Sequence, residues 1–490
     1  NTISINAASG IQLGPGSYAG TTIQGNTIAI NEGAGITFAV AGGAATGLVI
    51  GGSTAGAGNA ISGNGTAGVL VSAGTYTGTL VAGNSIQANK THGVSLAAAA
   101  GTIAGLTVGG SPSAANTITG NAGDGVNAAA GTYTATAVQA NTISSNTGAG
   151  VRLAPGSGSL VSLAVGGSTT SSDGNTLVGN TGGGIVAEAG TYTGTLVQGN
   201  AISGGSVGIR LADAQQITVG GATSDLGNAV SGATGRGLYA TGVLTTATAT
   251  SNTFTSNAVG AELEGATGFT FGNAGVGNRV VGGTQGIVAR GVLDNSRVLG
   301  NTVSGAGSGI VLADARGSSA SAPFQVGGLV TTAGNGVGNN VVGTTLGLHA
   351  RGALANTLVS GNVFRATAAG GNGAALVNAV GLMLGGLAAG DGNVLTAGLG
   401  NGLYAAGLNT GTRVYRNTIT ASQYGIVLDS ARNMFIGFLY NPAVGNLVQY
   451  NQVGLFSTGV NTGTGVTYTT WFRNVRTTIN GGNVFIFPAA

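Results

Sequence analysis

The chain has 490 residues, of which 99 are glycine and only 6% are charged. Its 15 basic and 12 acidic side chains give a net charge of +3 without a run of basic residues, which argues against a nucleic-acid-binding protein. Cysteine is absent, which excludes disulfides and cysteine-based metal sites.

A repeated phrase, Asn-x-Ile-x-x-Asn, organises the sequence from its first residue. It is clearest at Asn59, Ile61 and Asn64, and it recurs from Asn84 to Asn89. Self-similarity of this kind is typical of solenoids, in which each repeat packs on its neighbours. The leading asparagine gives 18 starts, at Asn1, Asn26, Asn59, Asn84, Asn116, Asn141, Asn175, Asn200, Asn228, Asn252, Asn278, Asn301, Asn339, Asn362, Asn393, Asn417, Asn446 and Asn474.

The gaps between these starts mostly alternate between short and long. From Asn1 to Asn228 they are 25, 33, 25, 32, 25, 34, 25 and 28 residues. Only the long coils carry a Val-Gly-Gly phrase or a variant of it, so the true repeat is a pair of coils. The first glycines of this phrase are Gly51, Gly109, Gly166, Gly220, Gly272, Gly327, Gly385 and Gly437.

Each coil holds three short apolar alternations bounded by glycine and asparagine, which is the pattern of short strands. In one coil they are Ala60-Ile61, Val69-Leu70-Val71 and Thr79-Leu80-Val81. The predicted fold is all-β: a single parallel β-helix of about 18 coils with three strands per coil. The apolar run at 374–390 is interrupted by Asn378 and keeps the repeat register, so we expect strands there and no membrane span.

The recurring asparagines predict a ladder. An asparagine at the same corner of every coil can hydrogen-bond to the coils before and after it, as in stacked parallel strands. The predicted ladder consists of Asn26, Asn59, Asn84, Asn116, Asn141, Asn175 and Asn200. Glycine supplies the positive φ that tight corners need.

A second phrase, Gly-Thr-Tyr-Thr, places Tyr76, Tyr133 and Tyr192 on alternate coils. One interpretation is that each ring covers a glycine corner. The alternative is that the three rings form a glycan-contact surface.

The composition changes near residue 400, which suggests a regular β-helix at 1–400 and an aromatic-rich end at 401–490. Aromatic residues are enriched at interfaces, and arginine accompanies them here. The rings can equally serve to thicken the last coils. The candidate interface residues are Tyr440, Tyr450, Trp471, Phe472, Phe485 and Phe487.

Three phrases carry a resemblance to a known family: Gly-Asn-Ala-Ile-Ser-Gly-Asn at 58–64, Gly-Val-Leu-Val at 68–71 and Val-Gly-Gly-Ser at 108–111. They resemble the right-handed parallel β-helix repeat proteins of the pectate-lyase-like superfamily, and more narrowly its long exported bacterial members. The resemblance implies a right-handed coil, as the crossover rule also does. It implies no single function, because the superfamily includes lyases, glycoside hydrolases, adhesins and fibre-forming surface proteins.

Enzymes of this superfamily need clustered carboxylates or a basic residue beside a bound cation. Here only Glu262 and Glu264 are close in sequence, and His92 and His349 lie far apart. Glu262 and Glu264 with Arg210 suggest either a weak cation or saccharide site or a solvated strand edge. We therefore expect no catalytic residues, no metal and no cofactor.

The favoured hypothesis is a non-enzymatic, exported bacterial protein that self-associates head to tail as a subunit of a cell-surface fibre, sheath or layer. The chain starts in repeat register without a hydrophobic leader, which suggests a removed signal peptide or a longer precursor. The alternative is an adhesin or carbohydrate-binding stalk with a polysaccharide partner. A polysaccharide lyase or glycoside hydrolase is less favoured.

Overall fold

The computed structural model describes residues 1–40, 43–99, 101–167, 171–328, 337–437, 442–474, 476–479 and 484–487. Strands dominate these ranges, and they pair in parallel to form a β-solenoid of about 17 turns, which confirms the predicted fold class. The helical segments in the described ranges are four single 3₁₀ turns, η1 Pro112–Ala114, η2 Ser171–Asp173, η3 Ser224–Leu226 and η4 Pro442–Val444. No helix in the part of the chain that the structure describes is long and apolar enough to cross a membrane.

The chain forms two compact units. Unit 1 contains Asn1–Tyr239 and Val243–Thr253, and unit 2 contains Ala240–Gly242 and Phe254–Ala490. Both are built from the same coil of three successive strands, here called the first, second and third strand, each of which pairs with its counterpart in the next coil. The boundary expected at 400/401 falls inside a strand of unit 2 and stays a prediction.

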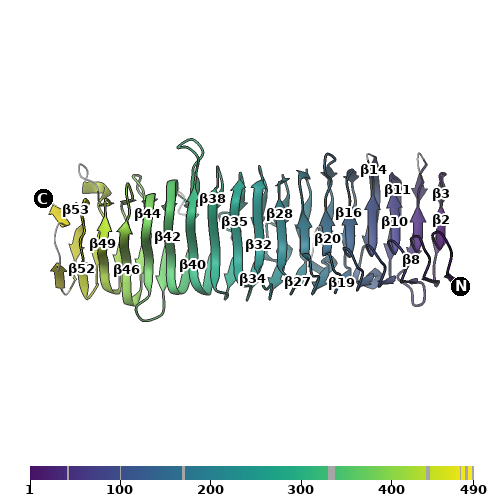
Figure 1. Cartoon of the computed structure of the whole chain (residues 1–490), viewed down its shortest axis with the longest axis horizontal. Helices are drawn as coiled ribbons and strands as arrows, with labels where there is room; N and C mark the ends of the chain where they lie inside the picture. The colour runs from purple at the N-terminus through teal and green to yellow at the C-terminus, as the bar shows by residue number, and fades with distance from the viewer. Residues whose placement is uncertain are drawn as a thin grey trace. The chain divides into compact units, whose positions relative to one another are not determined.

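In unit 1 the strands are short, and Figure 1 shows them stacked in chain order from β2 to β28. The first strands are β1 Thr2–Ser4, β5 Thr27–Ala29, β9 Ala60–Ser62, β12 Ser85–Gln87, β15 Thr117–Thr119, β19 Thr142–Ser144, β23 Thr176–Val178, β27 Ala201–Ser203 and β31 Ala229–Ser231. The second strands are β2 Ile11–Leu13, β6 Ile36–Phe38, β10 Val69–Ser72, β13 Val94–Ala97, β16 Val126–Ala128, β20 Ala149–Leu153, β24 Gly183–Ala187, β28 Val207–Ala212 and β32 Arg236–Val243. The third strands are β4 Thr22–Ile23, β8 Val49–Gly51, β11 Gly74–Ala82, β14 Thr102–Gly109, β18 Ala137–Gln139, β22 Ala164–Gly166, β26 Leu196–Gln198, β30 Thr218–Gly220 and β33 Thr248–Thr250.

The corner between the second and third strands of unit 1 adds short strands that the sequence pattern does not predict. They are β3 Tyr18–Ala19, β7 Ala45–Thr46, β17 Thr132–Thr134, β21 Leu160–Val161, β25 Gly190–Thr191 and β29 Ala214–Gln215. In β11 and β14 the same corner is continuous with the third strand.

In unit 2 the strands lengthen, and three of them run through the corners of a coil without a break: β40 Thr302–Arg316, β42 Asn340–Ser360 and β44 Asn372–Leu384. The separate first strands are β34 Thr253–Thr255, where the two units divide, β37 Arg279–Val281, β43 Val363–Ala366, β45 Val394–Thr396, β48 Thr418–Thr420, β51 Leu447–Gln449 and β54 Thr470–Phe472. The second strands are β35 Val259–Thr267, β38 Gln285–Val292, β46 Gly398–Leu408, β49 Ser422–Arg432, β52 Val453–Thr458 and β55 Arg476–Ile479. The third strands are β36 Thr270–Phe271, β39 Arg297–Val298, β41 Phe324–Gly327, β47 Arg413–Val414, β50 Phe435–Ile436, β53 Thr464–Thr467 and β56 Val484–Phe487.

The core is a set of aliphatic columns inside the coils. The central residues of successive first strands, Ile28, Ile61, Ile86, Ile118 and Ile143, pair in register and are each 0% exposed. Burying such a side chain contributes about 1.5–3 kcal/mol. Because the alternate positions of these three-residue strands point outward, the residues flanking each isoleucine form the surface.

Candidate functional site

A file of asparagine side chains runs beside the first strands and joins each coil to the next. The Asn116 Nδ2 donates to Asn141 Oδ1 at 2.8 Å and to the Val81 carbonyl oxygen at 2.6 Å. In return, Asn116 Oδ1 accepts both the backbone N–H and Nδ2 of Asn84 at 3.0 Å. The structure places all seven residues of the predicted ladder in this file: Asn26, Asn59, Asn84, Asn116, Asn141, Asn175 and Asn200.

A second file lies five residues further along each coil, and the sequence interpretation missed it as a ladder. In unit 1 it joins Asn6, Asn31, Asn64, Asn89, Asn121, Asn146 and Asn180 through the same side-chain bonds. The signal was present, because the repeated phrase ends in asparagine.

The second file also corrects one coil start. Asn474 accepts from Asn451 Nδ2 at 3.1 Å, and Asn451 stands five residues after Asn446. Asn474 therefore belongs to the second file, and the position equivalent to a coil start is Thr469. Thr469 replaces Asn474 as the last start, so the number of starts remains 18, and these delimit about 17 turns.

The tyrosines of the Gly-Thr-Tyr-Thr phrase are buried, so the glycan-contact interpretation of Tyr76, Tyr133 and Tyr192 is wrong. All three are 0% exposed. Each hydroxyl donates to the carbonyl oxygen four residues earlier, at 2.7, 2.6 and 2.6 Å respectively. The rings fill the corner between the second and third strands, where the hydroxyl closes a local turn. Burial raises the pKa of Tyr133 to about 12, opposed by a backbone hydrogen bond.

Tyr133→Phe is expected to lower the free energy of unfolding by about 1–3 kcal/mol, because the Ala129 and Leu96 carbonyl oxygens lose the donor that reaches them at 2.6 and 2.8 Å. Tyr18→Phe is the matched control, since the Tyr18 hydroxyl makes the same bond to Gly14 at a partly exposed site. Its effect should be smaller. Urea unfolding of both variants checks this, and equal effects would contradict the buried-turn role.

The aromatic C-terminal coils do form an exposed cluster, although a smaller one than the sequence suggests. The Tyr450 and Phe472 rings meet edge to face with centroids 5.9 Å apart, and they are 50% and 44% exposed. The Arg473 guanidinium lies 5.0 Å from the Phe472 ring and 5.8 Å from Tyr450. Trp471 is only partly exposed and sits at the central, core-facing position of β54, so it lies apart from this cluster. Tyr440 and the side chains of Phe485 and Phe487 lie outside the described residues.

His92 connects its own coil to the next one through Asp124. Its Nδ1 accepts the backbone N–H of Asp124 at 3.0 Å and lies 3.4 Å from Asp124 Oδ2. The other ring nitrogen, Nε2, lies 3.3 Å from the Asn127 side-chain nitrogen. Burial lowers the pKa of His92; the Asp124 carboxylate opposes this shift, and the Arg152 charge adds to it.

Stability is expected to fall as the pH drops below about 6.5, the ordinary pKa of histidine. The pKa of His92 is lowered in the folded chain, so the unfolded chain binds the proton first, and the stabilisation present above that pH is lost as His92 protonates. Burial and Arg351 lower the pKa of His349 in the same direction. Melting temperature against pH should have a shallower slope in His92→Gln, and an unchanged slope would contradict this role.

Two of the carboxylates, Glu188 and Glu262, are held in ion pairs with arginines. Arg152 Nη2 lies 2.9 Å from both oxygens of Glu188, with Arg210 at 3.9 Å. Arg290 Nε lies 3.0 Å from Glu262 Oε1, and the Glu262 side chain is only 4% exposed. The structure therefore gives Arg210 and Glu262 different partners, and the suggested cation or saccharide site of Glu262, Glu264 and Arg210 is not supported. No group of three or more histidine or carboxylate side chains suited to a metal occurs among the described residues.

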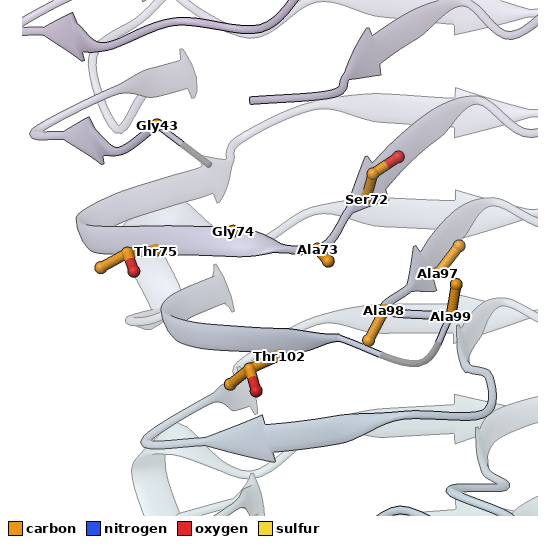
Figure 2. Close-up of a pocket in the computed structure, with 9 residues that line it drawn as sticks. All are labelled: Gly43, Ser72, Ala73, Gly74, Thr75, Ala97, Ala98, Ala99 and Thr102. Carbon is orange, nitrogen blue, oxygen red and sulfur yellow. The ribbon is translucent and has the colours of Figure 1, made fainter. Parts of the chain in front are cut away.

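The pocket drawn in Figure 2 is lined only by glycine, alanine, serine and threonine. It lies at the corner between second and third strands of unit 1, and its alanine side chains gather at one end while Thr75 and Thr102 lie at the other. Alcohols and methyl groups provide neither a strong acid or base nor a charge. The lining residues are Gly43, Ser72, Ala73, Gly74, Thr75, Ala97, Ala98, Ala99 and Thr102.

Comparison with known proteins finds one family similarity. Residues 168–367 match the family described as "Periplasmic copper-binding protein (NosD)", which is less than half of the chain. A search of curated proteins gives no match.

Solved structures with a similar fold include lyases and surface proteins. Vag8, from its complex with C1 inhibitor, is 13% identical over 98% of this chain and 99% of its own, with a TM-score of 0.34. An alginate lyase from Paenibacillus sp. is 15% identical over 62% of this chain and 93% of its own, with a TM-score of 0.26. The Streptococcus pneumoniae surface protein and adhesin PfbA is 12% identical over 86% and 92%, with a TM-score of 0.17. Similarity at this level transfers no function.

Proposed function

We propose that this chain is a non-enzymatic structural protein, exported to the cell surface, where it self-associates as a subunit of a fibre, sheath or layer. The observation that carries the proposal is that its polar side chains form contacts between neighbouring coils. The asparagine files, the His92 bridge and the ion pair of Arg152 with Glu188 all join one coil to the next. Several of the residues that could do chemistry thus stabilise the contacts between coils.

The asparagine files also favour a direction of assembly. Within the described residues the steps of these files run the same way, with the backbone N–H and Nδ2 of one asparagine donating to Oδ1 in the following coil, as from Asn59 to Asn84. A contact between copies that continued this direction would be heterologous. Heterologous contacts grow into filaments unless they close into a ring.

The family similarity supports export but not copper binding. The matched family is described as periplasmic, which favours a location outside the cytoplasm. Copper sites in proteins draw on histidine, cysteine and methionine. The matched segment contains His349 as its one imidazole and neither cysteine nor methionine, and the adjacent Arg351 charge opposes a cation there. These residues do not fit a copper site.

Electron microscopy of the purified chain over a range of concentrations tests the proposal. Filaments or sheets that grow with concentration are expected, and well-dispersed single chains at the highest concentration would contradict it. Incubation with pectin and alginate, with and without Ca²⁺, tests the enzyme alternative. Release of unsaturated or shortened products would overturn the non-enzymatic assignment.

A binding stalk is the second candidate, and the exposed cluster of Tyr450, Phe472 and Arg473 favours it. Two half-exposed rings and a guanidinium are the residue types that dominate binding sites. A Tyr450→Ala/Phe472→Ala variant should lose binding on a glycan or extracellular-protein array if this surface is an adhesive one. Tyr404→Ala/Tyr424→Ala is the control, because it removes two rings from the second-strand face instead.

A further inference from the structure

Two isoleucines occupy a corner that elsewhere in unit 1 takes small residues. Ile5 and Ile30 follow the first strands of successive coils with φ of 58° and 55°. The next three coils have Gly63, Ala88 and Gly120 at the same position, all with positive φ. A β-branched residue is strained in this left-handed region, and strained residues are concentrated at functional sites.

The same isoleucines are exposed. Ile5 is 79% exposed and Ile30 is 65% exposed. Neither the backbone conformation nor the exposure of these side chains favours folding. Their presence is better explained by a contact that covers them.

A notch lies beside Ile30, with an acid on one side and a base on the other. Its lining includes Ile30, Glu32, Gly63, Gly65 and Lys90. Gly63 and Gly65 form its floor because they have no side chains, while the coils before and after carry Glu32 and Lys90.

Backbone hydrogen bonds hold the two charges in register. Glu32, Gly65 and Lys90 each follow an asparagine of the second file, and Gly65 N–H donates to Asn31 O at 2.7 Å while Lys90 N–H donates to Asn64 O at 3.0 Å. Two coil spacings separate Glu32 from Lys90, or about 10 Å. Neither has an opposite charge within 4 Å among the described residues, which differs from the pairs of Arg152 with Glu188 and of Arg290 with Glu262.

We infer that this patch, formed by Ile5, Ile30, Glu32, Gly63, Gly65 and Lys90, is a two-fold contact with a second copy of the chain. A two-fold axis over Gly63 and Gly65 makes the two solenoids antiparallel and brings Glu32 of each copy to Lys90 of the other. This inference rests on the proposed self-association and adds a side-by-side contact to it.

The shape of the patch is self-complementary in the same arrangement. Along the corner the residues read Ile5, Ile30, Gly63, Ala88 and Gly120, so reversal places Ile30 opposite Ala88 and Ile5 opposite Gly120. Large side chains then meet small ones, and the glycines let the two backbones approach closely. Isologous contacts require a patch that matches itself in this way. The patch is small, so we expect a weak contact that salt weakens further.

Charge reversal tests the pairing directly. In Glu32→Lys the contact would place lysine against Lys90, and in Lys90→Glu it would place glutamate against Glu32, so each variant alone should associate about tenfold more weakly. Mixing the two variants should restore association, because each residue then meets an opposite charge. The double variant Glu32→Lys/Lys90→Glu should associate as the original chain does. Sedimentation velocity of the full chain measures all four.

Asp225→Lys and Arg297→Glu are the matched controls, since both reverse exposed charges away from the patch. They should leave association unchanged. If the original chain associates but the single variants associate equally well, or if mixing them fails to restore association, the two-fold contact is wrong and the proposed function stands. If the original chain does not associate at all, both fail.

Ile30→Gly separates folding from contact. Glycine adopts the positive φ of this corner without strain, so the variant should unfold at a higher temperature. It should also associate more weakly, because the apolar side chain is gone. Unchanged association would contradict the contact assigned to Ile30, and a lower unfolding temperature would contradict the strain assigned to it.

Discussion

Gly109→Ala is expected to destabilise unit 1 by more than about 3 kcal/mol, one of the largest effects for a change this small. Gly109 ends β14 with a φ of +88°. A Cβ there would overlap the carbonyl oxygen of Gln139 in the next coil and lie 2.7 Å from Asn141 Oδ1. The two coils would have to move apart at the asparagine file. This movement would weaken both the pairing of their strands and the hydrogen bonds of the ladder.

Gly120→Ala isolates the backbone term of this prediction. Gly120 has a φ of +63°, but a Cβ there meets nothing within 4 Å. Its cost should be about 1–2 kcal/mol, the ordinary cost of a left-handed alanine. Urea unfolding of both variants gives the comparison. Similar free energies of unfolding for the two would show that the close approach at Gly109 does not matter.

Asn116→Leu is expected to lower the free energy of unfolding by about 4 kcal/mol or more. Asn116 is 0% exposed. Leucine leaves the backbone N–H and Nδ2 of Asn84 without their acceptor and the Val81 carbonyl oxygen without its donor. Each buried polar group left unpaired costs about 1–3 kcal/mol.

Thr117→Ala is the control for the ladder, because this neighbouring side chain points outward from β15 and is exposed. Its effect should stay within about 0.5 kcal/mol. Hydrogen exchange should show that Asn116→Leu opens the coils on both sides of the substitution first. Unchanged exchange protection at Asn84 and Asn141 would indicate that the ladder bonds are dispensable.

The architecture was predictable because the repeat marks structural positions directly. The leading asparagine lies in the ladder, and the isoleucine two residues later lies in the core. The Val-Gly-Gly phrase lies at the corner where one coil closely approaches the next. Gly109 explains why that phrase recurs: only glycine permits both its φ and its distance from the next coil. Asn474 resembles a coil start in the sequence because both ends of the phrase are asparagine and Thr469 replaces the first of them.

The candidate surfaces were less predictable, because inward and outward positions alternate and corners obey no simple period. Tyr76, Tyr133 and Tyr192 lie at a corner, so their pattern did not show that they are buried. Trp471 could have been placed, since the alternation in Thr-Trp-Phe puts the central residue toward the core. The placement of Glu32 and Lys90 on either side of a glycine notch appears only once the coils are in register.

The central claim is that this chain is a structural protein, with polar side chains that join its coils, and that it associates with further copies of itself. Sedimentation velocity of the intact chain over a wide concentration range tests this claim. The average sedimentation coefficient is expected to rise with concentration and to fall again on dilution. A single species with the mass of one chain at every concentration would contradict it.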